Sequence, residues 1–176
     1  RLIRAKERLI ELLEEQKQAI IQRAVTRGLN PDVEMKGSGV DWLGEIPKHW
    51  EIVPLKYISH SMQNGSTPPT GIDSYYKNGS IPWFGPSSIN TAVEVGEPVR
   101  FVTEKAFRER VARKISPPSL LITVIGASAG KVALLSETGS TNQQITAAQL
   151  DSSKVNPLYI TLQVKLAEEW LRSNAS

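Results

Sequence analysis

The chain contains no cysteine, only two histidines and no long apolar segment. The absence of cysteine excludes a disulfide framework and cysteine-ligated metal sites. His49 and His60 lack the spacing of a metal-binding pair. No apolar run approaches the roughly 20 residues that cross a bilayer, and no signal-peptide pattern is present at the start. We therefore expect a cytoplasmic protein with no membrane partner and no resident metal.

Catalytic chemistry is also sparsely represented. The four aspartates are dispersed and lie mostly in loop contexts, at positions 32, 41, 73 and 151. The Asn-Pro-Pro-Tyr motif of adenine methyltransferases and the common cofactor fingerprints are both absent from the sequence. We therefore expect no enzyme activity and no bound cofactor in this chain.

The composition is that of a globular protein. Of the 176 residues, 40% are hydrophobic and 22% are charged, which suits one domain with an appendage. The formal net charge of +3 permits a nucleic-acid partner without requiring one. Six basic and two acidic residues lie from Arg100 to Lys114. This basic segment is either a phosphate-facing surface or a solvated helix face.

Residues 1–27 form the clearest predicted helix. They contain no glycine or proline, and Gly28 and Pro31 follow where a helix should end. At about 100° per residue, the apolar side chains cover roughly 200° of the surface, which is more than one neighbouring element can bury. We expect this helix to assemble with partners, and packing against its own domain is the alternative. The expected partner-binding residues are Leu2, Leu9, Leu12, Leu13 and Ile20.

Residues 37–57 bring together Trp42, Trp50, Pro47 and Pro54. The prolines exclude a long regular helix. We expect a wrapped segment whose tryptophans are buried anchors, since each can bury about 150–250 Å². Stacking of these rings on DNA is the lesser alternative.

The remainder of the chain predicts an α+β domain of short, mostly antiparallel strands. Ser119–Ile125 is a continuous β-branched and apolar run, typical of a strand buried on both faces. We expect residues 63–79 to form a functional loop, because idle connections are rarely so long. Strands are predicted at residues 52–58, 81–84, 98–102, 119–125, 131–135 and 143–150. The first of these is either a strand interrupted by Pro54 or a strand that leads into a helical turn. Helices are predicted at residues 104–113, capped by Thr103, and 157–171.

The turn Gly126–Lys131 has a partial likeness to the phosphate loop of a nucleotide-binding enzyme. A P-loop has four residues between its glycines and Ser or Thr after its lysine, whereas this turn has three residues and then Val132. A strand is expected to follow, where a P-loop needs a helix. Nucleotide binding is therefore the least favoured function. The glycines would allow close approach to a DNA phosphate beside Lys131, and a tight turn with a solvated lysine is the equal alternative.

Two segments carry a resemblance to a known family. Gln18–Asp32 and Gly39–Trp50 closely resemble the specificity subunit of type I restriction-modification systems, where a long conserved helix joins the second target-recognition domain. The turn Gly126–Lys131, with Asn142 and Gln143, also resembles the recognition domain of this family. The resemblance implies an antiparallel coiled coil that spaces two recognition domains and docks methyltransferase subunits.

The resemblance also implies a function. The protein would bind one half of a bipartite site in double-stranded DNA and position methyltransferase subunits, which hold S-adenosylmethionine and flip the target adenine. Restriction subunits would join for cleavage, and self-association through the helix is a further expectation. The implied organisation is a spacer helix at residues 1–28, a linker or docking segment at residues 29–50 and a recognition domain at residues 51–176. This domain is expected to be incomplete, because the family's usual final part and second helix do not follow Leu171.

Candidate DNA contacts follow from side-chain chemistry. Amide, hydroxyl and basic side chains on loops match base edges and phosphates. Members of the family differ in the residues that select the sequence, so the resemblance assigns no candidate to a base. The candidates are Gln63, Asn64, Ser66, Thr67, Lys77, Ser87, Ser88, Asn90, Arg113 and Lys131. The alternative function is a helical interaction or scaffold module without DNA readout, whose affinity would not fall steeply with salt.

Overall fold

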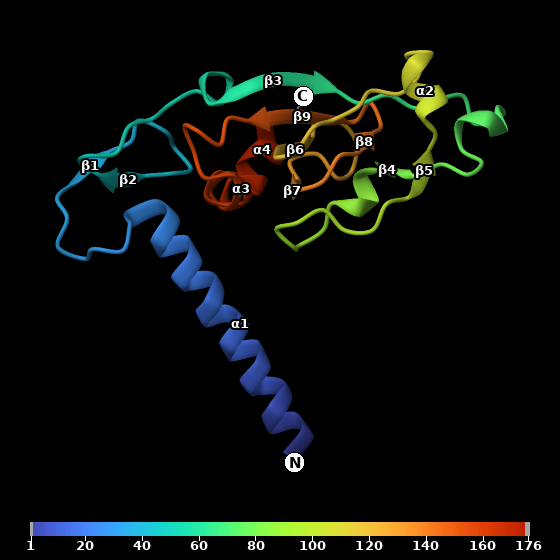
Figure 1. The fold of residues 1–176 in the computed structure, drawn as a ribbon. Coiled ribbons are helices and arrows are strands. Elements are labelled where there is room, and N and C mark those ends of the chain that lie inside the picture. The colour runs from blue at the N-terminus through green and yellow to red at the C-terminus, as the bar shows by residue number, and fades with distance from the viewer. Residues whose placement is uncertain (1, 175–176) are drawn as a thin grey trace. The chain divides into compact units, whose positions relative to one another are not determined.

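The computed structural model describes residues 2–174. Two compact units lie on either side of the boundary between Ile52 and Val53. The fold class is α+β, as predicted, with a long N-terminal helix and short, mostly antiparallel strands (Figure 1). Within the described part of the chain, no helix is both long and apolar enough to cross a membrane.

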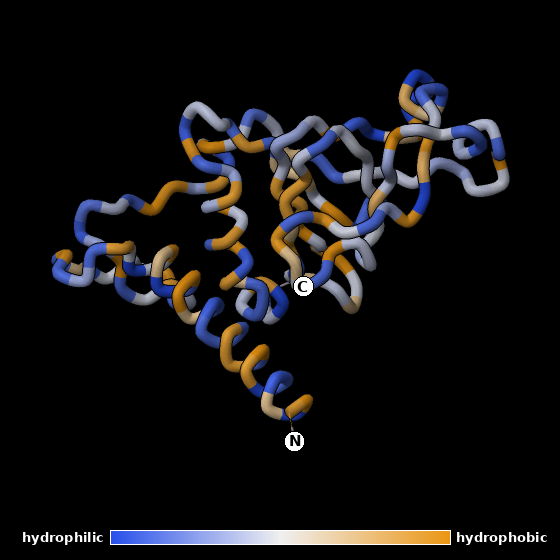
Figure 2. Tube along the Cα trace, turned by 60° about the horizontal axis from the view of Figure 1, so that its bottom comes forward, coloured by the Kyte–Doolittle hydropathy of each residue, from blue (hydrophilic) through white to orange (hydrophobic). Residues whose placement is uncertain are grey.

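The first unit begins with helix α1, Leu2–Arg27, in agreement with the prediction. Gly28 follows with a positive φ of 77°, the left-handed conformation that glycine often adopts at helix ends. Hydrophobic and hydrophilic positions alternate along the helix in Figure 2, and Val25 is buried. The candidate partner residues are all exposed, from 45% at Leu12 to 71% at Leu2. The apolar stripe is therefore not covered by the helix's own unit.

A small hairpin follows the helix, and the sequence did not predict it. Strands β1 (Met35–Gly37) and β2 (Glu45–Pro47) pair in antiparallel fashion. Ile46 of β2 is only 1% exposed. Trp50 lies beside the helix end, since a β-carbon built on Gly28 would come 3.5 Å from its ring. Both tryptophans of this segment are partly buried, which is less than the full burial predicted for them.

The second unit contains a main sheet and a smaller sheet. The main sheet has the strand order β3-β9-β6-β7, with every neighbouring pair antiparallel. Its strands are β3 (Ser59–Asn64), β9 (Ile145–Leu150), β6 (Ser119–Thr123) and β7 (Val132–Leu135). The smaller sheet, in the order β5-β4-β8, comprises β5 (Arg100–Val102), β4 (Ile81–Phe84) and β8 (Ser140–Thr141). The helices are α2 (Glu104–Arg108), α3 (Pro157–Leu166) and α4 (Glu168–Asn174).

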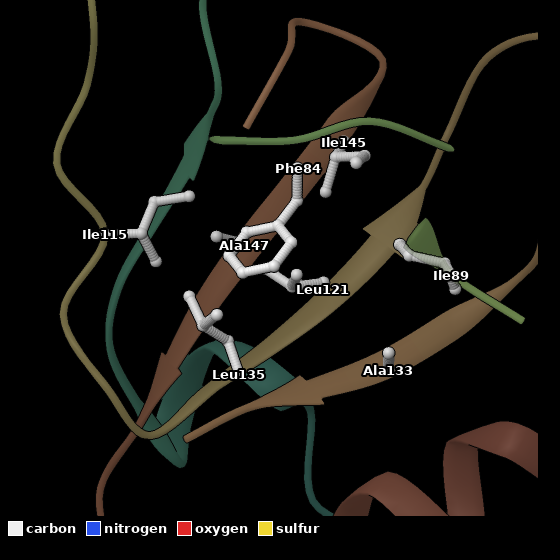
Figure 3. Close-up of a cluster of buried hydrophobic side chains, with 8 residues drawn as sticks. All are labelled: Phe84, Ile89, Ile115, Leu121, Ala133, Leu135, Ile145 and Ala147. Carbon is white, nitrogen blue, oxygen red and sulfur yellow. The ribbon is translucent and has the colours of Figure 1, made fainter. Parts of the chain in front are cut away.

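Two hydrophobic clusters cover opposite faces of the main sheet. On one face, Phe84 of β4 packs with Leu121 and Leu135 (Figure 3). On the other face, Leu120 packs with Ile160 of α3. Adjacent residues of β6 thus enter different clusters, which confirms the prediction of a strand buried on both faces.

Residues 52–58 contain no strand, so the strand predicted there is wrong, but the helical turn of the alternative prediction is present. Leu55–Tyr57 forms a 3-10 turn, and β3 begins only at Ser59. Pro54 precedes the turn with a φ of −56°, and its missing N–H cannot join a strand ladder. Since β3 extends to Asn64, the first two residues of the predicted functional loop, Gln63 and Asn64, belong to the strand.

The helix predicted at residues 104–113 is shorter than expected. It ends at Arg108, because Arg110 has a positive φ of 59° and the chain turns to bury Ala112. Thr103 precedes the helix but does not cap it with its side chain, because its hydroxyl donates to the Ser74 carbonyl oxygen at 2.9 Å.

The helix predicted at residues 157–171 is divided at Ala167 into α3 and α4. The break lies where a contact with β7 forms. The Glu168 carboxylate accepts hydrogen bonds from the Val132 amide and the Lys165 ammonium group, each at 3.0 Å. A tertiary contact therefore accompanies the end of α3, and the local sequence pattern contains no sign of it.

Candidate nucleic-acid interface

Segments that are distant in the sequence meet at one end of the main sheet. Strands β3 and β6 end there, and β7 and β9 begin there, because neighbouring strands are antiparallel. In the register, Thr146 lies opposite both Asn64 and Ile122, and Ile122 also lies opposite Val132. We call this region the loop end of the sheet, and it comprises residues 64–67, 124–131 and 142–146.

Asn64 is held at the loop end by two neighbouring segments. The Thr146 hydroxyl donates to Asn64 Oδ1 at 2.8 Å, and the Arg113 guanidinium donates to the Asn64 carbonyl oxygen at 3.2 Å. The Gln63 side chain donates to the Lys114 carbonyl oxygen at 2.9 Å. The structure therefore brings together three predicted site residues, of which Asn64 and Arg113 are exposed and Gln63 is partly buried.

The loop after β3 makes a close backbone contact at Gly65. Its amide donates to the Ile145 carbonyl oxygen at 3.0 Å, and the Ser66 amide donates to the Thr141 carbonyl oxygen at 2.8 Å. The hydroxyl of Ser66 is buried, so it does not face an external ligand. This contact fixes where the next residue of the loop emerges.

Thr67 is that next residue, and it reaches a second exposed amide side chain. Its hydroxyl donates to Oε1 of Gln143 at 2.7 Å, although 76 residues separate the two in the chain. Both side chains are exposed. The loop end thus presents two amide side chains, Asn64 and Gln143, each held by a threonine hydroxyl.

The turn 124–131 forms a hairpin between β6 and β7. Gly126 and Gly130 have positive φ angles of 93° and 88°, and a strand follows the turn. The absence of a helix at this turn excludes the P-loop arrangement. A β-carbon on Gly130 would lie 2.6 Å from the Glu168 carbonyl oxygen, so the turn packs closely on α4. Lys131 is partly exposed at the start of β7.

The remaining candidates are more widely placed. Ser87 and Asn90 are exposed. The Lys165 ammonium group donates to the carbonyl oxygens of Asn90 and Val132, at 3.1 Å each. Asn90 therefore lies near the start of β7. Ser88 is buried, and its hydroxyl donates to the Glu97 carbonyl oxygen at 2.8 Å. Lys77 is exposed beyond the 3-10 turn Asp73–Tyr75, outside the loop end.

Much of the basic segment from Arg100 to Lys114 is engaged within the fold. The Lys114 ammonium group lies 3.1 Å from a carboxylate oxygen of Glu104, and the Lys105 ammonium group donates to the Ser74 hydroxyl at 2.9 Å. Arg108 and Arg110 are exposed and form no ion pair with another described residue. The segment therefore combines internal contacts with free positive charge.

A carboxylate within this segment, that of Glu109, raises the pKa of a buried tyrosine. The Tyr75 hydroxyl donates to Oε2 of Glu109 at 2.6 Å. This hydrogen bond, followed by burial of the ring, raises the pKa of Tyr75 above its ordinary value. Tyr75 therefore stays neutral and serves as a buried anchor beneath α2.

Two residues of the loop end were not among the predicted contacts. Gln143 was noted as part of the resemblance, and both Gln143 and Thr146 were assigned to the strand predicted at residues 143–150. Two signals could have identified them. Gln143 is a polar residue just before a strand, and Thr146 is a partly exposed position that alternates with buried Ile145. The described residues contain no cluster of three His, Cys, Asp or Glu side chains that could hold a metal ion.

Comparisons with known proteins point to one kind of protein. A family model described as type I restriction modification DNA specificity domain matches residues 47–176. The crystal structure of an HsdS subunit from Thermoanaerobacter tengcongensis aligns with 99% of this chain and 39% of its own length, at a TM-score of 0.62 and 17% identity. A structure concerned with complex assembly and conformational transition of the type I R-M system aligns with 99% of this chain and 40% of its own, at a TM-score of 0.55 and 14% identity. At these identities the likeness is one of fold, and the chain spans about two fifths of each solved protein.

Proposed function

We propose a function from one premise: the chain belongs to the family of type I restriction-modification DNA specificity domains. Its role is accordingly that of a specificity component in such a system. We propose that the second unit binds one half of a bipartite site in duplex DNA. The loop end of the main sheet, together with Arg113, would form the contact surface.

The pair of oriented amides at the loop end is the observation that supports this proposal most directly. Threonine hydroxyls occupy the side-chain oxygens of Asn64 and Gln143. Neither amide NH₂ group forms a hydrogen bond with another described residue, so both can donate to a ligand. Such donors match N7 and O6 of guanine, N7 of adenine and O4 of thymine in the major groove.

The charge of the loop end favours a polyanion. Its three segments contain no Asp or Glu, and Lys131 lies within them. Arg113 adds a second positive charge beside Asn64. Basic side chains that flank base-reading amides can contact phosphates and fix the register of the protein on the duplex.

Helix α1 suggests how the protein would join its partners. Its exposed leucines and isoleucines form a stripe that requires another apolar surface. We propose that this stripe docks methyltransferase subunits, with S-adenosylmethionine bound by those subunits and not by this chain. Restriction subunits would join the same assembly, and the same stripe would support self-association of the chain.

Selection from a randomised duplex library, at two salt concentrations, tests the DNA-binding proposal. Circular dichroism would first establish that the chain is folded. We expect a short half-site to be enriched and its affinity to fall as salt increases, because phosphate contacts release counterions. Repeating the selection with methyltransferase subunits should enrich the same half-site. If neither preparation enriches a sequence, the helical interaction module without DNA readout becomes the better account.

A further inference from the structure

Arg100 lies between two aromatic rings. It is directly opposite Trp83 in the pairing of β5 with β4. The central guanidinium carbon lies 5.4 Å from the centroid of the Trp83 ring and 5.1 Å from that of Tyr76. Both distances are within the roughly 6 Å range of cation–π attraction. The side chain is partly buried and forms no ion pair with a described carboxylate.

The same two rings hold the loop that leaves β3. The Trp83 indole N–H donates to the Ser66 carbonyl oxygen at 3.1 Å, and the Tyr76 hydroxyl donates to the Pro68 carbonyl oxygen. We call this group the Arg100 clamp: the side chains of Tyr76, Trp83 and Arg100 with the carbonyl groups of Ser66 and Pro68. Because Ser66 and Pro68 precede and follow Thr67, the two hydrogen bonds of the clamp hold the chain on both sides of this residue.

The chain that joins this loop to β5 is also constrained. A β-carbon on Gly79 would lie 2.8 Å from backbone atoms of Phe101 and Val102. The Thr103 amide donates to the Tyr75 carbonyl oxygen at 2.9 Å. Residues 66–79 are therefore fastened to β5 near their end and to the clamp near their start.

We infer that Arg100 is a positioning residue for DNA recognition. The clamp fixes Thr67, and Thr67 in turn orients the amide of Gln143 at the loop end. Arg100 acts through the rings of Tyr76 and Trp83 and does not itself contact DNA. This inference rests on the proposed function of the loop end.

Substitution of Arg100 by lysine separates positioning from charge. Lysine keeps the positive charge but lacks the planar guanidinium that stacks on both rings. We expect Arg100→Lys to reduce the preference for the selected half-site over random duplex by about tenfold, because one compact ammonium group cannot lie against both rings at once and one contact is lost. Trp83→Phe keeps a ring but removes the N–H bond to Ser66, and it should reduce the preference in the same direction.

The matched control is Arg108→Lys. Arg108 belongs to the same basic segment but is exposed and outside the clamp. This control should leave the half-site preference unchanged. Arg100→Ala tests whether Arg100 itself contacts a phosphate. Loss of a phosphate contact would lower the slope of log affinity against log salt by about 0.9. Loss of a positioning residue leaves this slope unchanged.

Hydrogen exchange without DNA makes the inference testable independently of binding. Peptides covering residues 66–76 should exchange faster in Arg100→Lys and Trp83→Phe than in the unaltered protein, with no change in Arg108→Lys. Faster exchange together with lost preference and an unchanged slope supports the inference. Unchanged exchange, or a lowered slope in Arg100→Ala, overturns it. Absence of any half-site for the unaltered protein overturns the proposed function itself, whatever the exchange data show.

Discussion

At the scale of single residues, the absence of a β-carbon at Gly65 allows the loop after β3 to pack against the end of the smaller sheet. A β-carbon on Gly65 would lie 2.1 Å from the Thr141 hydroxyl and 2.3 Å from the carbonyl oxygens of Thr141 and Asn142. The carbonyl groups belong to the backbone and cannot move aside by a side-chain rotation. Glycine is therefore required at this position for the loop to reach its place.

Gly65→Ala should lower the free energy of unfolding by about 1–3 kcal/mol, because the added methyl group forces the backbone apart. Thermal and urea denaturation would measure the loss. Gly71→Ala is the control in the same loop, since a β-carbon there meets no atom within 4 Å. The control should change stability by less than about 0.5 kcal/mol. Equal stability of the two variants would contradict the argument from close contact.

Gln143→Ala should relax sequence selection at one base position and leave the rest of the half-site unchanged. A well-placed amide contact contributes about 1–3 kcal/mol of discrimination against the wrong base. Competition binding with single-base variants of the selected site would measure it. Gln149→Ala is the control, because Gln149 lies near the far end of β9, the strand that follows Gln143. A uniform loss of affinity for every sequence would argue against base readout by Gln143.

At the scale of elements, the turn after β9 is stabilised by hydrogen bonds to the carboxylate of Asp151. Asp151 accepts hydrogen bonds from the Ser153 hydroxyl at 2.6 Å and from the Ser153 amide at 3.0 Å. The hydroxyl contact is the main cause that lowers the pKa of Asp151 below its ordinary 3.8. A lowered pKa in the folded state stabilises the protein above pH 3.8 and loses this effect as pH falls through the folded value.

The variant Asp151→Asn should therefore be less stable than the unaltered protein at neutral pH, and the difference should shrink on acidification below about pH 4. Urea unfolding over a pH series would measure the two curves. Asp73→Asn, in an exposed turn of the same unit, serves as the comparison. Parallel stability curves for Asp151→Asn and the unaltered protein at all pH values would refute the claim that the ionised Asp151 carboxylate stabilises the fold.

Helix α1 should act as an assembly element. Leu9→Glu combined with Leu13→Glu places two charges in the exposed apolar stripe, and an apolar partner surface cannot solvate them. We expect co-purification with a methyltransferase subunit to fall while circular dichroism still reports a folded protein. Gln18→Glu with Gln22→Glu adds the same charge on the other side of the helix and should retain the partner. Unchanged co-purification of the leucine variant would remove the support for this docking surface.

At the scale of the whole molecule, the two units should carry separable properties. The helix variant should keep the half-site that the unaltered protein selects, because the loop end lies entirely in the second unit. Gln143→Ala should keep the methyltransferase partner. Both variants would be measured by both assays, selection and co-purification. A change of selected sequence in the helix variant would show that half-site selection does not depend on the second unit alone.

The sequence by itself determined the elements whose causes are local. Helix α1 follows from a run without glycine or proline that ends at Gly28, because helical hydrogen bonds join residues four apart. Strand β6 follows from its unbroken apolar run, and the hairpin with β7 follows from the glycines of the turn. The resemblance in the segments around Trp42 and Trp50 identified the family, and the family match agrees with it.

Only the tertiary structure decided which polar residues share a surface. Strand β3 is formed by a polar stretch, and pairing with β9 stabilises it despite its low apolar content. Asn64 and Thr146 are 82 residues apart, and Thr67 and Gln143 are 76 apart, so no local pattern records their contact. The burial of the Ser66 hydroxyl and of the whole Ser88 side chain likewise depends on long-range packing. Side-chain chemistry identified the candidate residues in the sequence. Which of them share one surface depends on strand register, because antiparallel pairing places distant chain segments at one end of a sheet.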